Sequence, residues 1–310
     1  MKKFLAIFNK VGGKEILRQY LQSHVLLFAL IQTLLQGFSK KSLEIVRLSV
    51  NNKRLKKLHK KYRKTIAAFP KSTAPREQSK KVWVCWLQGM ENAPELVQKC
   101  YASLHTHLPD REIITITEDN YRDFVTFPDH IQAKIHSGAI TKTHFSDLLR
   151  LELLITYGGT WIDATVYCSG KPHGYMLDSE LFAFQTLKPG LDGHPVCMSS
   201  WFLTACTNHP ILLLTRELLY TYWRKNTKLA DYFLLHDFFQ LAIDAYPEEW
   251  KQVMPFSNEL PHILLLRLFE EYKGEVWEAV RDMTPIHKLT YKFTPEQTQI
   301  PDTYYQKLFS

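Results

Sequence analysis

From Lys81 onward the chain alternates between two hydrophobic patterns. Short apolar runs rich in β-branched and aromatic residues predict buried strands, and these runs cover residues 81–89, 111–120 and 160–168. Stretches with apolar residues at every third or fourth position predict helices, and these cover residues 93–108, 121–138, 142–159, 209–225 and 229–246. The first six elements follow in the order β-α-β-α-α-β, which predicts an α/β domain with a mostly parallel sheet flanked by helices.

The ends of two predicted strands carry side chains that suit a ligand. In open α/β sheets, ligands bind in the crevice beyond the carboxyl ends of the strands. Residues 86–89 and 163–165 fall at such ends, so we expect the functional site there.

The first 80 residues have a different character, and we expect a basic amphipathic helical extension at 1–80 and the α/β domain at 81–310. The uninterrupted apolar run Val25–Ile31 is far shorter than the roughly 20 residues that a membrane-spanning helix needs. Residues 53–64 (KRLKKLHKKYRK) place apolar residues at helical spacing among lysines and arginines. The polar segment 69–81, which contains two prolines, is the expected linker.

The charge of the chain is concentrated in this extension. It holds 19 Lys and Arg against 3 Asp and Glu, a net +16, whereas the remainder holds 20 against 28, a net −8. The basic surface either docks on anionic membrane lipid or is the solvated face of helices packed on the main domain. Lipid docking is the interpretation we favour. Nucleic acid is not expected as a partner, because no nucleic-acid-binding module accompanies the charge.

Cysteine usage indicates a reducing compartment. The five cysteines form neither a CxxC motif nor a zinc-like cluster. No signal-peptide pattern opens the chain, so we expect reduced thiols and a cytoplasmic protein, peripheral on the inner face of the plasma membrane.

Three polar residues share one turn of the helix predicted at 142–159. Ser146, Asp147 and Arg150 lie at i, i+1 and i+4, so their side chains are close enough to act together. A hydroxyl, a carboxylate and a guanidinium in this arrangement can bind sugar hydroxyls and a phosphate. A helix cap followed by a local ion pair explains the same residues, and for this motif alone it is the simpler interpretation.

Asp163 and Thr165 form the second polar pair. Residues two apart in a strand project from one face, so both side chains point the same way. A single carboxylate binds a divalent ion poorly, but Mg²⁺ keeps several waters and takes much of its negative charge from substrate phosphates. A threonine hydroxyl can serve as a neutral ligand beside them. Asp-x-Thr is therefore a weaker form of an Asp-x-Asp site for metal and diphosphate.

Taken in order, the segments WLQG, APELVQKC, SDLLRLELL, YGGTWIDATV and DYFLLH resemble the capsular polysaccharide synthesis glycosyltransferases, which are related to the DxD-containing glycosyltransferase family 32. The resemblance covers roughly residues 81–246. It implies a GT-A-like fold, a nucleotide-sugar donor, a divalent metal (Mn or Mg) and retention of anomeric configuration.

The resemblance also implies roles for individual residues. Trp86 would stack on the nucleobase, and Asp163 would face the donor diphosphate and its metal together with Trp161. Ribose, donor sugar and phosphate would be held by Ser146, Asp147 and Arg150. Thr165 stands where the wider group has a second acid, so it is the candidate for a further, neutral metal ligand.

His236 lies in a predicted apolar helix, where a structural role is the more frequent outcome. GT-A enzymes often take a metal or diphosphate ligand from this part of the chain, so we also consider His236 as a metal ligand.

The expected activity is transfer of a hexose, with a UDP-sugar as the expected donor, to a lipid-linked surface or capsular polysaccharide. A metal together with Arg150 would stabilise the anionic leaving group. No pair of acids with a glycosidase-like pattern stands out, so hydrolysis through two carboxylates is not favoured. The alternative is a non-catalytic scaffold with the same fold, in which Thr165 marks a lost metal site.

Overall fold

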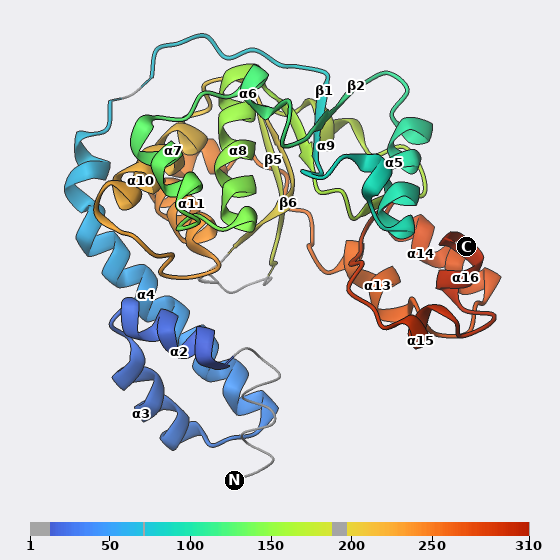
Figure 1. Ribbon diagram of the computed structural model, residues 1–310, viewed down its shortest axis with the longest axis horizontal. Coiled ribbons are helices and arrows are strands. Elements are labelled where there is room, and N and C mark those ends of the chain that lie inside the picture. The colour runs from blue at the N-terminus through green and yellow to red at the C-terminus, as the bar shows by residue number, and fades with distance from the viewer. Residues whose placement is uncertain (1–12, 71, 188–196, 310) are drawn as a thin grey trace.

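The computed structural model describes residues 13–70, 72–187 and 197–309. At its centre lies a five-stranded sheet (Figure 1) with the spatial order β2 (Glu112–Ile116), β1 (Lys81–Cys85), β3 (Gly159–Ile162), β6 (Met198–Ala205) and β5 (Leu181–Gln185). Strand β1 is parallel to β2 and β3, whereas β6 is antiparallel to both β3 and β5. Only β6 therefore runs against the other strands, which confirms the predicted mostly parallel sheet of an α/β fold.

Helices cover both faces of the sheet, because successive strand residues point to opposite sides. Trp83 and Trp161 face one side and Val82 and Val84 the other. The tryptophan side packs against α7 (Asp129–His136), α8 (Lys142–Tyr157), α10 (Pro210–Lys225) and α11 (Leu234–Ala245). The valine side packs against α5 (Glu95–His107) and α9 (Gly174–Asp178). Figure 1 shows the two helical layers on either side of the strands.

Two glycines connect α8 to β3. Gly158 ends α8 with φ +65° and Gly159 opens β3 with φ +96°, a region that side chains other than glycine rarely adopt. A Cβ on Gly159 would lie 2.3 Å from the carbonyl oxygen of Lys81. Glycine is therefore required for β3 to pair closely with β1, and this close turn sets the residues of α8 beside the end of β3.

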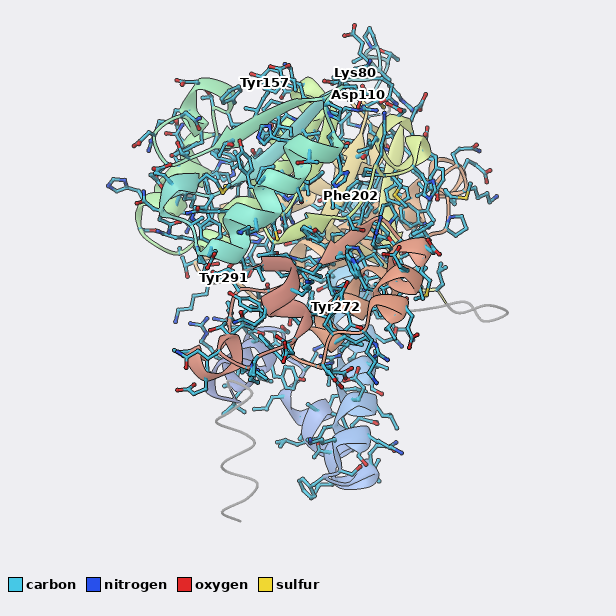
Figure 2. All side chains as sticks on the ribbon, turned by 90° about the vertical axis from the view of Figure 1, so that its right-hand side faces the viewer. Lys80, Asp110, Tyr157, Phe202, Tyr272 and Tyr291 are labelled. Atoms are coloured by element: carbon cyan, nitrogen blue, oxygen red, sulfur yellow. The ribbon has the colours of Figure 1, made fainter. Side chains whose placement is uncertain are left out.

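The carboxyl-terminal segment adds a second, two-stranded sheet. Strand β4 (Val166–Cys168) pairs antiparallel with β7 (Ile286–Lys288), with Val166 opposite Lys288. The helices of this segment are η2 (Leu260–His262), α13 (Ile263–Arg267), α14 (Gly274–Met283), α15 (Pro295–Thr298) and α16 (Tyr304–Phe309). Several of them pack with α5 in a core of their own, and Figure 2 shows Tyr291 where this segment meets the sheet domain. The register brings a lysine from the far end of the chain to the end of β3.

The remaining short helices are η1 (Met90–Asn92), α6 (Tyr121–Phe124) and α12 (Pro247–Trp250).

The amino-terminal helices are α2 (Gly13–Gln22), α3 (Leu26–Gln36) and α4 (Lys40–Ala68), and α2 and α3 stand away from the sheet domain (Figure 1). The second half of α4 belongs to the main core, since Leu58 and Tyr62 are buried in it. Arg54 on the same helix is 2% exposed and forms ion pairs of 2.6 Å with Asp231 and 2.8 Å with Asp237. In the described parts of the chain, no helix has the length and apolar character to cross a membrane.

Candidate active site

A line of alternating charges joins α8 to the end of β3. Arg150 donates from Nη1 to Asp147 Oδ1 (2.6 Å) and from Nη2 to Asp163 Oδ1 (3.3 Å). The Arg150 guanidinium also lies 4.8 Å from the ring centroid of Trp161, whose Nε1 donates to Asp163 Oδ1 at 2.9 Å. The fold thus brings together four of the residues proposed from the sequence, at the carboxyl end of β3.

Lys288 completes this cluster from β7. Its Nζ donates to Asp163 Oδ2 at 3.1 Å and to Thr165 Oγ1 at 2.5 Å. Partial burial disfavours the charge on Asp163, but Lys288 and Arg150 outweigh it and lower the pKa of this carboxyl below its ordinary value. Asp163 is therefore ionised at neutral pH, with both carboxylate oxygens engaged. Lys288 was not among the residues proposed from the sequence, because only the pairing of β4 with β7 brings it here.

A buried histidine holds Asp147 from its other side. Trp223 Nε1 donates to His144 Nε2 at 2.9 Å, so Nε2 is the acceptor and Nδ1 carries the proton. His144 Nδ1 lies 3.3 Å from Asp147 Oδ2 and donates to it. His144 is 1% exposed, so this chain of hydrogen bonds fixes the carboxylate that in turn orients Arg150. The signal in the sequence was the i, i+3 spacing of His144 and Asp147.

Helix α11 and the residues before it approach the cluster from another direction. His236 interacts electrostatically with Asp147, Arg150 and Asp163, and its burial lowers the pKa of the imidazole to about 4. Its Nδ1 is buried and has no hydrogen-bond partner among the described residues. Tyr232, more than half exposed, also interacts electrostatically with Asp147 and Asp163. His236 is therefore neutral at pH 7, and it lies near the cluster.

Trp86 lies directly after β1, and Ser146 lies next to Asp147 on α8. The Nε1 of Trp86 is buried, with no hydrogen-bond acceptor among the described residues. Its ring packs edge-on against Tyr291, with centroids 5.4 Å apart. Ser146 is half-buried on α8, one turn before Arg150. The predicted roles of both residues in nucleotide binding remain predictions.

The proposed metal ligands Asp163, Thr165 and His236 do not fit a resident divalent ion. Within residues 13–70, 72–187 and 197–309, no three His, Cys, Asp or Glu side chains gather at a site that could hold a metal. An ion that bridged Asp163 Oδ2 and Thr165 Oγ1 would need the position of the Lys288 ammonium, which contacts both oxygens. A second cation there would be repelled. The only carboxylate among the three is therefore already neutralised by the protein itself.

Comparison with known proteins gives the relatives of the chain. O-glycosyltransferase braB of Annulohypoxylon truncatum is 27% identical over 54% of this chain and 43% of that protein. O-glycosyltransferase PaGT of Phomopsis amygdali is 28% identical over 29% of this chain and 24% of that protein. The chain thus spans less than half the length of the curated relatives it matches.

The solved structure titled PaToxG Glycosyltransferase matches 86% of this chain and 97% of that chain, with a TM-score of 0.39 and 16% identity, which is too remote to support a conclusion. The model of the family described as "Capsular polysaccharide synthesis protein" matches residues 35–308, a range that includes α4, the sheet and every residue of the candidate site. This match confirms the family predicted from the sequence motifs, and the chain belongs to the capsular polysaccharide synthesis protein family.

Proposed function

We propose that the protein is a glycosyltransferase that moves a hexose from a nucleotide sugar, a UDP-hexose, to a lipid-linked surface or capsular polysaccharide acceptor with retention of anomeric configuration. Family membership and the names of the relatives support a transferase enzyme. The donor, the acceptor and the stereochemistry rest on the chemistry of the site.

One observation carries the proposal: Arg150 and Lys288 flank Asp163 at the carboxyl end of β3. Rupture of a glycosyl–diphosphate bond places negative charge on the departing diphosphate. Fixed cations near that position stabilise the transition state more than the ground state. Asp147 and Asp163 hold the two cations in place before the donor binds, and both cations keep further N–H donors for phosphate oxygens.

The same contacts favour a front-face displacement over a covalent intermediate. Asp163 is held on both oxygens, and Asp147 is held by His144 and Arg150. Burial raises the pKa of the Cys85 thiol to about 12, so it stays protonated. No free nucleophile remains among these described groups. In the displacement, the acceptor oxygen forms the new bond to the anomeric carbon as its bond to the diphosphate oxygen breaks. The acceptor proton passes to the departing diphosphate.

Lys288 takes the part expected of a metal ion in this proposal. It supplies positive charge beside Asp163, where the donor diphosphate is expected, and needs no further cofactor there. Arg150 provides the second charge from the opposite side. The donor would thus be activated by two side chains that α8 and β7 position.

We place the protein on the inner face of the plasma membrane, docked through α2 and α3. These helices expose large apolar side chains, with Leu34 and Leu35 each 74% exposed. The neighbouring α4 is rich in lysine. Apolar contact with the bilayer together with attraction to anionic lipid is the usual basis of such docking.

An assay with the purified protein tests the activity directly. Incubation with a panel of nucleotide sugars, with release of the free nucleotide as readout, should show turnover with a UDP-hexose. The Arg150→Met variant should lose most of that turnover. Failure of every nucleotide to bind in calorimetry would instead favour the non-catalytic scaffold.

A further inference from the structure

A cavity at the root of the amino-terminal helices carries a concentration of positive charge. It has a volume of 370 Å³ and lies between the α2–α3 turn, α4 and the segment that follows α10. Four lysines line it: Lys57 and Lys61 from α4, and Lys225 and Lys228 from the sheet domain. Arg54 also lines it. The volume falls within the range of small-ligand sites.

Among the described residues, no carboxylate pairs with the lysines of this cavity. The lining residues include no Asp or Glu. Arg54 is paired with Asp231 and Asp237, but none of the four lysines forms an ion pair with any described residue. Lys57 donates to the carbonyl oxygen of His24 at 2.5 Å. Lys61 lies 6.0 Å from the ring centroid of Tyr222. Like charges gathered at one cavity repel each other, and a bound anion would relieve that repulsion.

We propose that this cavity binds the phosphate head group of an anionic membrane phospholipid. The proposal rests on the membrane contact proposed above and names the site that recognises the lipid. Ser23 and His24, in the turn between α2 and α3, line the cavity, so it adjoins the helices that expose their leucines. A phospholipid can place its acyl chains against α3 and its phosphate among the lysines. Asn226 and Thr227 add neutral hydrogen-bond donors to the same lining.

The cavity is connected to the candidate active site through one short segment. Ala230 lines the cavity, and Asp231 pairs with Arg54 at its edge. The next residue, Tyr232, interacts electrostatically with Asp147 and Asp163 of the site. A lipid head group in this cavity would therefore contact a segment that is only two residues from Tyr232, which interacts with the cluster. This geometry would hold the active site near the membrane surface, where a lipid-linked acceptor is found.

The test compares two triple variants of the full-length protein with equal loss of charge. Lys57→Ala/Lys61→Ala/Lys225→Ala removes lysines of the cavity. Lys56→Ala/Lys60→Ala/Lys64→Ala removes exposed lysines of α4 that do not line it. Sedimentation with vesicles of phosphatidylcholine, with and without phosphatidylglycerol, measures binding. If binding depends only on general electrostatic attraction, each lysine removed should weaken affinity by about fivefold. The two variants would then lose affinity equally.

We expect the cavity variant to bind phosphatidylglycerol vesicles at least about tenfold more weakly than the control variant, with thermal unfolding unchanged in both. Equal loss in the two variants, or no loss in either, would overturn the cavity as the site while leaving membrane contact intact. Failure of the wild-type protein to bind any anionic vesicle would refute the membrane contact itself. Binding only to vesicles that carry a polyprenyl diphosphate would assign the cavity to the acceptor lipid and overturn the proposal as stated.

Discussion

Lys288 and Asp163 form an ion pair of 3.1 Å across 125 positions of the sequence. The pair places a permanent cation where a divalent metal would bind Asp163 and Thr165. It also depends on the second sheet, because β7 reaches this point only through its pairing with β4. The electrostatics of the site therefore come from two distant parts of the chain.

Lys288→Met should lower turnover by about 10²–10³, the scale for loss of one preorganised electrostatic contact. Methionine keeps much of the length of the side chain but removes the charge beside the leaving diphosphate. UDP affinity, measured by calorimetry, should fall as well. Lys292→Met is the matched control, since it removes the charge of an exposed lysine four residues further along the chain and should leave turnover unchanged. Equal activity of Lys288→Met and wild type would show that Lys288 does not contribute.

Asp163→Asn should cost about as much as Lys288→Met, because it releases both Arg150 and Lys288 from their shared carboxylate. Thr165→Val should cost clearly less, since the hydroxyl carries no charge. Thr165→Asp would place a second carboxylate at Lys288 and complete an Asp-x-Asp pair, which should make turnover more responsive to Mn²⁺. Steady-state kinetics of the three variants, with and without Mn²⁺, tests this order. If Asp163→Asn retains near-wild-type turnover, Asp163 is only a strand-end residue.

Arg54→Met should destabilise the fold by about 3–5 kcal/mol, because it leaves the buried carboxylates of Asp231 and Asp237 without their cation. Burial already raises the pKa of Asp237 to about 6 despite Arg54. Asp237 directly follows His236 on α11, and His236 lies near the candidate site. Turnover of the variant should therefore decrease together with its free energy of unfolding. Urea unfolding measures the first effect, and Lys56→Met on the exposed face of α4 is the control, with an expected change within about 0.5 kcal/mol.

Acid should destabilise the protein through its buried histidines, and two of them, His209 and His287, lie outside the polar cluster around Asp163. Burial lowers the pKa of His209 to about 4 and that of His287 to about 3. In the unfolded chain both titrate near 6.5. Their contribution is therefore complete above pH 6.5 and is lost as the pH falls toward 4, by about 2 kcal/mol per histidine between pH 7 and 5. Asp237, with its raised pKa, acts in the opposite direction.

Urea unfolding at pH 7 and pH 5 measures this dependence. The double variant His209→Gln/His287→Gln should lose about 4 kcal/mol less than wild type over this interval. His59→Gln, on the exposed face of α4, should behave as wild type. An identical pH dependence in the double variant and wild type would contradict the assignment.

Local patterns were sufficient for one part of the site. Helical spacing joined Asp147 to Arg150, and the two-residue period of a strand placed Asp163 with Thr165. Each pair lies within a few residues of the end of a helix or strand that the hydrophobic pattern predicts. The glycines at 158–159 allow β3 to pair closely with β1 directly after α8.

Pairings between strands that are far apart in the chain could not be predicted from local sequence patterns. Strands β5 and β6 were not predicted, because β6 is placed by antiparallel pairing with the distant β3, and β5 is placed only by its pairing with β6. The same holds for β7 and hence for Lys288. Helices α15 and α16 near the carboxyl terminus were also not predicted, because they are too short for helical periodicity to be detected. Arg54 looked like one more surface cation, although it is buried against α11.

We propose that Arg150 and Lys288 activate a nucleotide-sugar donor without a metal ion. The decisive measurement is turnover of UDP-hexose by the wild-type protein, followed by UDP release before and after exhaustive treatment with EDTA. The predicted result is the same rate under both conditions, with the Lys288→Met variant slow in both. Loss of wild-type turnover in EDTA with recovery on addition of Mn²⁺ would contradict it.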